Sequence, residues 1–316
     1  MKPLFNRAST WVKNRFGQRI QKIPVNAGFS CPNRDGKLSD QGCLYCNNES
    51  FSPFYSTEKQ TIADQLHHGR EYYAKRYGCN RFFAYFQSYS CTYAPVETLR
   101  QKYLEAAAGE GIEGLIIATR PDCIDAEIVA LLQEIAERTF VRLELGVESF
   151  DDAVLAGMNR CHGAAAALKS ISMLKSAGIP VCIHLISGMP GEKDNHMGTA
   201  ARAVSNSGAD MVKLHHLQIV KGSRLAKLYA EHPENYHLYS LDEYLDKVCE
   251  FIANLSPAIC LERFVSRVPL DQLIAPVFSG IDEAGFQRLL ETRLRKLGLY
   301  QGSGIIASDS EKSQAL

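Results

Sequence analysis

Short apolar runs alternate with longer amphipathic stretches along most of the chain. The runs, rich in β-branched and aromatic residues, predict strands over 20–26, 81–88, 114–119, 141–147, 181–187 and 211–220. The stretches after them predict helices over 57–77, capped by Thr57, and over 96–109, 125–138, 164–178 and 195–208. Such alternation predicts a parallel sheet with crossover helices. Its spacing fits both a partial barrel and a doubly wound sheet, so the periodicity leaves both open.

The regular alternation of predicted strands and helices ends after Lys221. The sequence there predicts a helix over 241–255, a short strand over 259–268 and an amphipathic helix over 282–297, and the chain then ends in small and polar residues. No stretch is rich enough in Pro, Gly or Ser to mark a second independent domain. We therefore expect a core over 1–225 that includes a basic N-terminal segment, an extension packed on it over 226–300, and a disordered tail over 301–316.

The charge of the chain is balanced overall but uneven locally. Its 316 residues are 46% hydrophobic and 22% charged, with a formal net charge of zero, so no overall field attracts nucleic acid or a membrane. Residues 1–34, however, carry several basic side chains and no acidic one. This segment contains Trp11 and Phe16. It is either a surface segment whose rings pack on the core, or an arm that contacts RNA phosphates and stacks on a base.

No targeting segment is evident. The sequence lacks a run of the ~20 apolar residues that a membrane-spanning helix needs. Its N-terminus also lacks the continuous apolar region of a secretory signal. We therefore expect a cytoplasmic protein that does not contact membrane, in which the ten cysteines are not paired as disulfides.

A group of cysteines is the strongest local signal for chemistry. Cys31, Cys43 and Cys46 lie in a loop rich in Gly and Asn that follows the first predicted strand. Structural zinc needs four protein ligands, and the next candidates, His67 and His68, fall within a predicted helix. A [4Fe–4S] cluster held by three thiolates keeps one iron open to an external ligand. The spacing therefore favours iron–sulfur over zinc, while the other, scattered cysteines are expected to be buried small apolar side chains.

Further motifs follow the cysteines in order along the chain. They are Tyr-Phe-Gln-Ser-Tyr-Ser-Cys-Thr-Tyr-Ala-Pro (85–95), Ala-Thr-Arg-Pro-Asp-Cys (118–123), Glu-Leu-Gly-Val-Glu-Ser (144–149), Met-Asn-Arg-Cys-His (158–162), His-Leu-Ile-Ser-Gly-Met-Pro-Gly-Glu (184–192) and Lys-Leu-His-His-Leu-Gln-Ile-Val-Lys-Gly-Ser (213–223). Together with the cysteine segments 31–36 and 42–47, they resemble the radical S-adenosylmethionine (SAM) superfamily. More narrowly, they resemble the bacterial YhcC/YtqA-type proteins, relatives of the Elongator catalytic subunit. The resemblance covers residues 15–300.

The resemblance implies a fold and a set of ligands. The fold is a partial (β/α)6 barrel with a short C-terminal strand and helix extension, whose ligands bind at the C-terminal ends of the strands. It implies a [4Fe–4S] cluster on Cys31, Cys43 and Cys46, and SAM beside it. The SAM contacts implied are Gln87, Ser88, Glu148, Ser149, Arg160 and Gly188.

Some of these positions have other interpretations. Many superfamily members carry Gly-Gly-Glu after the second strand to bind the SAM amino group, whereas this sequence has Phe86-Gln87-Ser88. Glu148 and Arg160 can also form a plain ion pair. The histidines at 184, 215 and 216 can be packed or hydrogen-bonded core residues instead of ligands. No individual catalytic residue is assigned.

The resemblance also implies a reaction. Superfamily members cleave SAM to a 5′-deoxyadenosyl radical that abstracts a hydrogen atom, and Elongator-type proteins act on the wobble uridine of tRNA. We therefore expect an enzyme that modifies a tRNA base, at the side chain of a wobble uridine, with a reducing partner such as flavodoxin or ferredoxin. Two alternatives stay open: a radical SAM enzyme acting on a small metabolite or tetrapyrrole, and a non-catalytic, zinc-stabilised RNA-binding protein.

Overall fold

A curved sheet of seven parallel strands organises the protein. The computed structural model describes residues 3–51, 53, 55–266 and 268–305. The strands lie side by side in the order β1 (Gln21–Val25), β2 (Phe82–Phe86), β3 (Ile112–Thr119), β4 (Phe140–Glu148), β5 (Val181–Ser187), β6 (Met211–His216) and β8 (Cys260–Leu261). A doubly wound sheet reverses its strand order at a switch point, and this order does not reverse. The predicted partial barrel is therefore confirmed.

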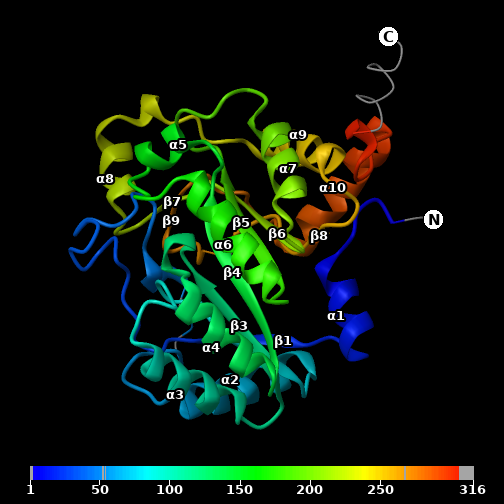
Figure 1. Ribbon diagram of the computed structural model, residues 1–316. Helices are drawn as coiled ribbons and strands as arrows, with labels where there is room; N and C mark the ends of the chain where they lie inside the picture. The colour runs from blue at the N-terminus through cyan, green and yellow to red at the C-terminus, as the bar shows by residue number, and fades with distance from the viewer. Residues whose placement is uncertain (1–2, 52, 54, 267, 306–316) are drawn as a thin grey trace.

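Helices cover the convex face of this sheet (Figure 1). Those that connect the strands are α2 (Ile62–Tyr77), α3 (Val96–Ala107), α4 (Ala126–Ala136), α6 (Ala164–Ser176) and α7 (His196–Ser207). In the C-terminal part, α9 (Leu241–Asn254) packs against α7, and α10 (Glu283–Leu297) packs against α9. These elements agree with the predicted helices to within a few residues, except at the start of α2.

Several short elements were not predicted. They are α1 (Ala8–Phe16), α5 (Asp152–Gly157), α8 (Arg224–Glu231), the strands β7 (Ile219–Val220) and β9 (Leu273–Ala275), and the 3₁₀ turns at Asn48–Phe51, Pro121–Cys123 and Pro233–Asn235. The strand predicted over 211–220 is divided, because β6 ends at His216 and β7 pairs antiparallel with β9 instead of continuing the main sheet. The strand predicted over 259–268 is only two residues long.

The first helix after β1 begins later than predicted. Thr61, not Thr57, is the N-cap of α2, and its side chain accepts a hydrogen bond from the backbone of Asp64. The reason is the buried side chain of Gln65, whose amide donates to the carbonyl oxygens of Asn26, Thr57 and Gln60. The segment before the helix is therefore wrapped around Gln65 as a turn.

The two faces of the curved sheet differ in polarity. Residues on the convex face are apolar and contact the helices, as in Ile23, Ala84 and Leu143, which are fully buried. The alternate positions point into the concave side and include charged and polar residues, such as Glu144 and His184. Because side chains alternate along a strand, one sheet can build an apolar core on its outside and a polar chamber on its inside.

Helix α1 packs against the end of the barrel where the strands begin. The ring of Phe16 lies 5.3 Å from those of Phe83 and Phe140, and the ring of Trp11 lies 6.0 Å from that of Phe140. Trp11 and Phe16 are therefore used in packing on the barrel, one of the two roles considered for them. The guanidinium of Arg15 lies over the rings of Trp11 and Phe140.

Segments near the two ends of the described chain lie side by side, since the backbone N–H of Gln301 donates to the carbonyl of Leu4. Residues before α1 also extend the sheet beyond β8, where the backbone N–H of Leu261 donates to the carbonyl of Asn6. Most of the tail predicted to be disordered, 306–316, lies outside the described residues. Residues 301–305 are described, and the buried side chain of Gln301 donates to the carbonyls of Ser256 and Ile259.

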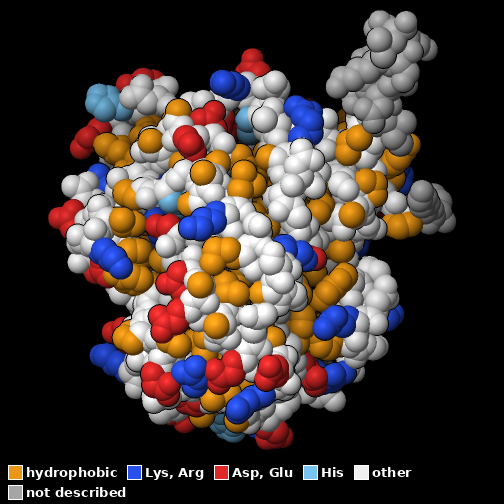
Figure 2. All heavy atoms as spheres, viewed as in Figure 1, with side chains coloured by type: hydrophobic (Ala, Val, Ile, Leu, Met, Phe, Trp, Pro, Cys, Tyr) orange, Lys and Arg blue, Asp and Glu red, His pale blue; other side chains and the backbone are white. Residues whose placement is uncertain are grey.

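Within the described residues, no helix has the length and apolar character needed to cross a membrane. Acidic and basic side chains intermix over the lower helices in Figure 2.

The packing of α2 on β1 depends on a glycine. A Cβ atom at Gly69 would lie 2.3 Å from Cγ2 of Ile23 and 3.1 Å from the ring of Tyr55. Both neighbours are buried, so neither can move aside easily. Glycine is a poor helix former, and its presence in the middle of α2 is explained by this close approach.

We expect Gly69→Ala to lower the free energy of unfolding by about 1–3 kcal/mol, because overpacking a core costs that much. Gly157→Ala in α5 is the matched control, since an added Cβ there meets nothing within 4 Å. The control is expected to change stability by less than about 0.5 kcal/mol. Urea unfolding measures both variants, and equal stability of the two would contradict the close contact between α2 and β1.

Candidate functional site

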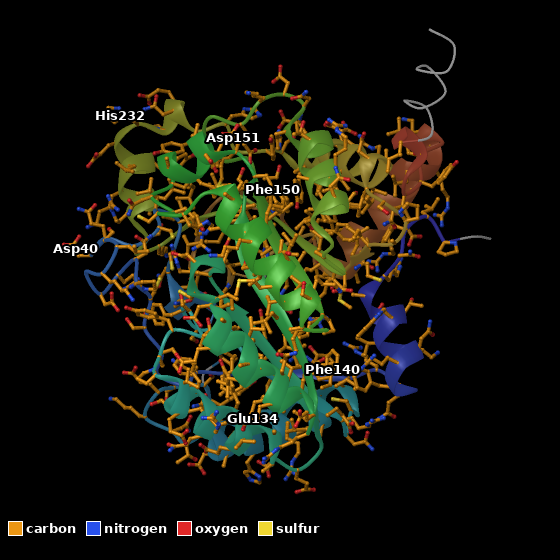
Figure 3. All side chains as sticks on the ribbon, viewed as in Figure 1. Asp40, Glu134, Phe140, Phe150, Asp151 and His232 are labelled. Atoms are coloured by element: carbon orange, nitrogen blue, oxygen red, sulfur yellow. The ribbon has the colours of Figure 1, made fainter. Side chains whose placement is uncertain are left out.

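A cavity of about 500 Å³ occupies the concave side of the sheet and extends to the ends of the strands. Its walls come from the loop after β1, from β2 to β6, and from the segment after β8. Figure 3 shows the direction of β4, from Phe140 beside α1 to Phe150 and Asp151 at the other end of the barrel. The C-terminal end of β4, where Glu148 lines the cavity, is thus remote from α1.

Three cysteines of the loop after β1 line this cavity. The thiols of Cys31, Cys43 and Cys46 are free, and all belong to the same wall region as Tyr45. The side-chain amide of Asn33 donates to Sγ of Cys43 (3.4 Å) and to the carbonyl of Asn159 (2.7 Å). The structure thus brings together the cysteines that the sequence singled out.

Helix α8 and the turn after α5 hold this loop in place. The backbone N–H of Leu44 donates to the carbonyl of Met158, and the N–H of Leu225 donates to the carbonyl of Leu44. The side-chain amide of Asn159 donates to the carbonyl of Gly42 (2.7 Å). The conformation of the loop is therefore fixed by segments far away in the sequence.

Two arginines lie beside the cysteines. Arg160 donates to Sγ of Cys43 (3.4 Å) and to the carbonyl of Gly146, and it lies 3.7 Å from the carboxylate of Glu148. Arg120 is buried, donates to the carbonyl of Arg160 (2.8 Å) and pairs with Asp122. Their side chains bring two positive charges to the thiol end of the cavity.

These charges affect the thiols unequally. Burial raises the pKa of the Cys43 thiol, but the charge and hydrogen bond of Arg160, with Arg120, outweigh it, so the pKa is lowered overall. Burial and the neighbouring Cys43 raise the pKa of Cys46 to about 12. Cys43 is therefore the more easily ionised of the two, which suits a metal ligand.

Strained backbone is concentrated around this site. Among the described residues, the non-glycine positions with positive φ are Tyr89, Glu148, Asn159 and Cys161. Tyr89 and Glu148 line the cavity, Asn159 holds the cysteine loop, and Cys161 follows Arg160. Such conformations cost of order 1–3 kcal/mol each and persist where the surroundings impose them, often at functional sites.

Of the other predicted site residues, some line the cavity and some do not. Gln87, Ser88, Glu148 and Arg160 line it, whereas Ser149 and Gly188 are not part of its wall. The hydroxyl of Ser149 accepts a hydrogen bond from the backbone of Asp151 at the start of α5. Gly188 has a φ of +95°, and a Cβ there would lie 3.1 Å from the ring of Tyr239, so an aromatic side chain of the protein fills that space.

The interior end of the cavity contains a charged network whose pairings were not predicted from the sequence. The buried carboxylate of Glu144 accepts hydrogen bonds from Lys22 (2.6 Å), Arg142 (2.7 Å), His184 (2.7 Å), Lys213 (2.8 Å) and Tyr85 (2.9 Å). Glu262, which follows β8, pairs with Lys22 of β1 and with Arg142. These ion pairs bridge the two edge strands of the sheet. Polar residues at alternate positions of the predicted strands were the signal that could have revealed them.

Three histidines line the cavity beside this network. Burial and the charge of Lys213 lower the pKa of His184 to about 4, and burial lowers the pKa of His216 to about 4. Burial and Arg263 lower the pKa of His215 well below its usual value. All three are therefore neutral at pH 7. His184 is hydrogen-bonded and His216 stacks on Phe278, as expected for packed core histidines.

Comparison with known proteins identifies the family. The family model of the radical SAM superfamily matches residues 31–204, and that of the Radical_SAM C-terminal domain matches residues 209–296. The chain belongs to the radical SAM superfamily. It is 34% identical to YhcC of Escherichia coli K12 over 88% of both chains. It is 30% identical to YtqA of Bacillus subtilis over 92% of this chain and 89% of that one.

More distant similarities also exist. The tRNA uridine(34) acetyltransferase of Methanocaldococcus infernus is 28% identical over 58% of this chain and 34% of its own. A solved structure of Elp3 from the same archaeon has a TM-score of 0.67 and 17% identity, and the match covers 89% of this chain and 64% of that one. The similarity to the Elp3 structure concerns the fold alone. Family membership makes the protein a radical SAM enzyme, which sets aside the non-catalytic zinc-binding alternative.

The radical SAM family implies a [4Fe–4S] cluster and SAM, and the residues of this cavity suit both. Free thiols, buried arginines and buried polar atoms without a partner among the described residues (the hydroxyl of Tyr45 and Nε of Arg160) face the same region. In the described part of the chain, no three His, Cys, Asp or Glu side chains converge on one point that could hold a metal ion. A four-iron cluster binds each thiolate to a different iron, so it does not require such convergence.

Proposed function

We propose that this enzyme holds a [4Fe–4S] cluster with Cys31, Cys43 and Cys46 and binds SAM next to it. When bound, the pair supplies reductive cleavage of SAM to a 5′-deoxyadenosyl radical. The observation that carries the proposal is that the three thiols of the loop after β1 line one cavity at the barrel end. The reducing partner is expected to be a flavodoxin or ferredoxin.

The residues around the thiols have separate tasks in this proposal. Arg160 and Arg120 offset the negative charge of the thiolates, as the lowered pKa of Cys43 supports. Arg160 also faces the region where the carboxylate of SAM is expected. Glu148, whose pKa is raised by burial against the opposing effect of Arg160, is placed to accept hydrogen bonds from ribose hydroxyls.

The SAM amino group needs a different ligand from the common Gly-Gly-Glu. Gln87 and Ser88 occupy that position at the end of β2 and line the cavity. Their amide and hydroxyl oxygens can accept hydrogen bonds from an ammonium group, although they bring no negative charge. Ser149 and Gly188 are not part of the cavity wall, and their contacts with SAM stay predictions.

Replacing any one of Cys31, Cys43 and Cys46 by Ala is expected to reduce iron from about four per chain to near zero after anaerobic purification, because each thiolate holds one iron. Cys79→Ala is the matched control, since that thiol bonds the carbonyl of Tyr73 away from the cavity. Iron and sulfide analysis measures the effect. Full iron content in all three variants would overturn the ligand assignment.

For the substrate, we propose a tRNA base, modified at the side chain of a wobble uridine. The support is the sequence similarity to a tRNA uridine(34) acetyltransferase. Exposed basic side chains near the cysteine loop are compatible with a polyanion: Arg34 lines the cavity, and Lys221 and Lys227 belong to the segment that docks on the loop. The basic helix α1 lies at the opposite end of the barrel, so it does not act at the cavity mouth.

Bulk tRNA is expected to increase the yield of 5′-deoxyadenosine when it is added to anaerobic, reduced, cluster-loaded enzyme with SAM. A protein-free control and ribonuclease-treated tRNA establish that intact tRNA is required. Mass spectrometry of tRNA nucleosides from a deletion strain is expected to show altered wobble uridines. If tRNA does not change the yield of 5′-deoxyadenosine and the tRNA nucleosides are unchanged, the tRNA substrate is rejected in favour of a small metabolite. The cofactor assignment would remain intact.

A further inference from the structure

The interior end of the cavity carries more positive than negative charge. Among the described residues, Lys22, Arg142 and Lys213 share only two carboxylates, those of Glu144 and Glu262. All these ion pairs are largely withdrawn from solvent, with Glu144 and Lys213 buried. The network by itself therefore has one uncompensated positive charge next to the cavity.

Arg263 adds a second positive charge to the same wall. Its carbonyl accepts a hydrogen bond from the backbone of Leu214 in β6, which fixes it beside that strand. The guanidinium contacts the ring of His215 (3.1 Å), and its buried Nε has no partner among the described residues. Within the described ranges, no carboxylate oxygen lies within 4.0 Å of a guanidinium nitrogen of Arg263, so this arginine forms no ion pair there.

No neighbour of Arg263 in the described ranges forms an ion pair with it. His215 contacts the guanidinium, and burial and Arg263 lower the pKa of that imidazole well below its usual value. The carboxylate of Glu283 instead accepts hydrogen bonds from the backbone of Phe264 and Val265. A cavity-facing guanidinium without a carboxylate partner is available to bind an anionic ligand.

We propose that Arg263 binds an oxyanion of the substrate, a carboxylate or a phosphate, in the interior end of the cavity. The inference rests on the proposed function, because it takes the chamber beyond the thiols as the place of the substrate. A guanidinium binds either oxyanion through two parallel hydrogen bonds. The surrounding protein strengthens that attraction because it replaces water.

The site is separate from the arginines next to the thiols. Arg160 donates to Sγ of Cys43, and Arg120 donates to the carbonyl of Arg160, whereas Arg263 follows β8 and contacts His215 of β6. The carboxylate of SAM thus has its own cationic partner at the thiol end. The oxyanion held by Arg263 belongs to the second molecule in the cavity, the one that is modified.

The test measures binding and does not depend on turnover. Cluster-loaded, SAM-saturated enzyme is heated anaerobically with sodium acetate, inorganic phosphate, sodium chloride of equal ionic strength, or acetamide. We expect acetate or phosphate to raise the unfolding midpoint by roughly 2 °C at ten times its dissociation constant. Chloride and the neutral acetamide are expected to give no such rise. The anion with the larger effect distinguishes a carboxylate from a phosphate substrate.

Variants locate the effect. Arg263→Gln is expected to abolish the rise and Arg263→Lys to retain part of it. Arg293→Gln is the matched control, because Arg293 pairs with Asp242 and Asp246 on the surface, and it should behave as the wild type. The wild-type comparison of acetate with acetamide remains decisive even if a variant at position 263 does not fold.

Three results would overturn the inference. They are an equal effect of acetate and acetamide, an undiminished rise in Arg263→Gln, and a rise that is present in cluster-loaded enzyme without SAM but absent from the SAM-saturated enzyme, which would show that Arg263 holds the carboxylate of SAM itself. Each result is independent of whether tRNA stimulates SAM cleavage. Failure of the oxyanion site is therefore distinguishable from failure of the proposed function.

Discussion

The carboxylate of Glu144 is the interaction on which the chamber depends. It lies in the middle of β4, is fully buried, and is contacted from β1, β2, β5 and β6. A lone buried carboxylate is very costly, and so are the buried ammonium and guanidinium groups around it, so each stabilises the others in place. Removing the carboxylate of Glu144 would leave the buried ammonium of Lys213 without its nearest carboxylate. The network thereby keeps a polar floor inside a barrel whose outer face is a conventional apolar core.

Next to this network, the cavity has two parts with different chemistry. At the end of the strands, thiols meet Arg160, Arg120 and a cluster of residues with strained backbone. Gly146 shows how tightly this part is built, since a Cβ there would lie 2.7 Å from Arg160 and 2.8 Å from Glu148. In the interior, neutral histidines and Arg263, which forms no ion pair among the described residues, face the remaining space. The first part suits a cofactor that needs fixed ligands, and the second suits a polar substrate.

Much of the fold could be predicted from the sequence, because the periodicity of apolar residues indicates which side chains pack between the sheet and its helices. The apolar runs of β3 and β5 are local signals, and the structure confirms these strands. The cysteine loop was equally clear. Thr61 as the cap of α2, the tyrosine that fills the space at Gly188, and the pairing of Lys22 with Glu262 depend on residues far apart in the sequence. Sequence reasoning took Glu148 and Arg160 as SAM contacts, yet it missed Arg263 because that residue follows a strand of only two residues.

The most direct test of the central claim is electron paramagnetic resonance of the anaerobic, reduced protein before and after addition of SAM. If three thiolates hold a four-iron cluster with one open iron, the reduced protein gives a cluster signal, and SAM changes that signal because it binds the open iron. The same preparation of Cys43→Ala gives no such signal. A wild-type protein that contains zinc and is silent, or a cluster signal that SAM leaves unchanged, would contradict the account.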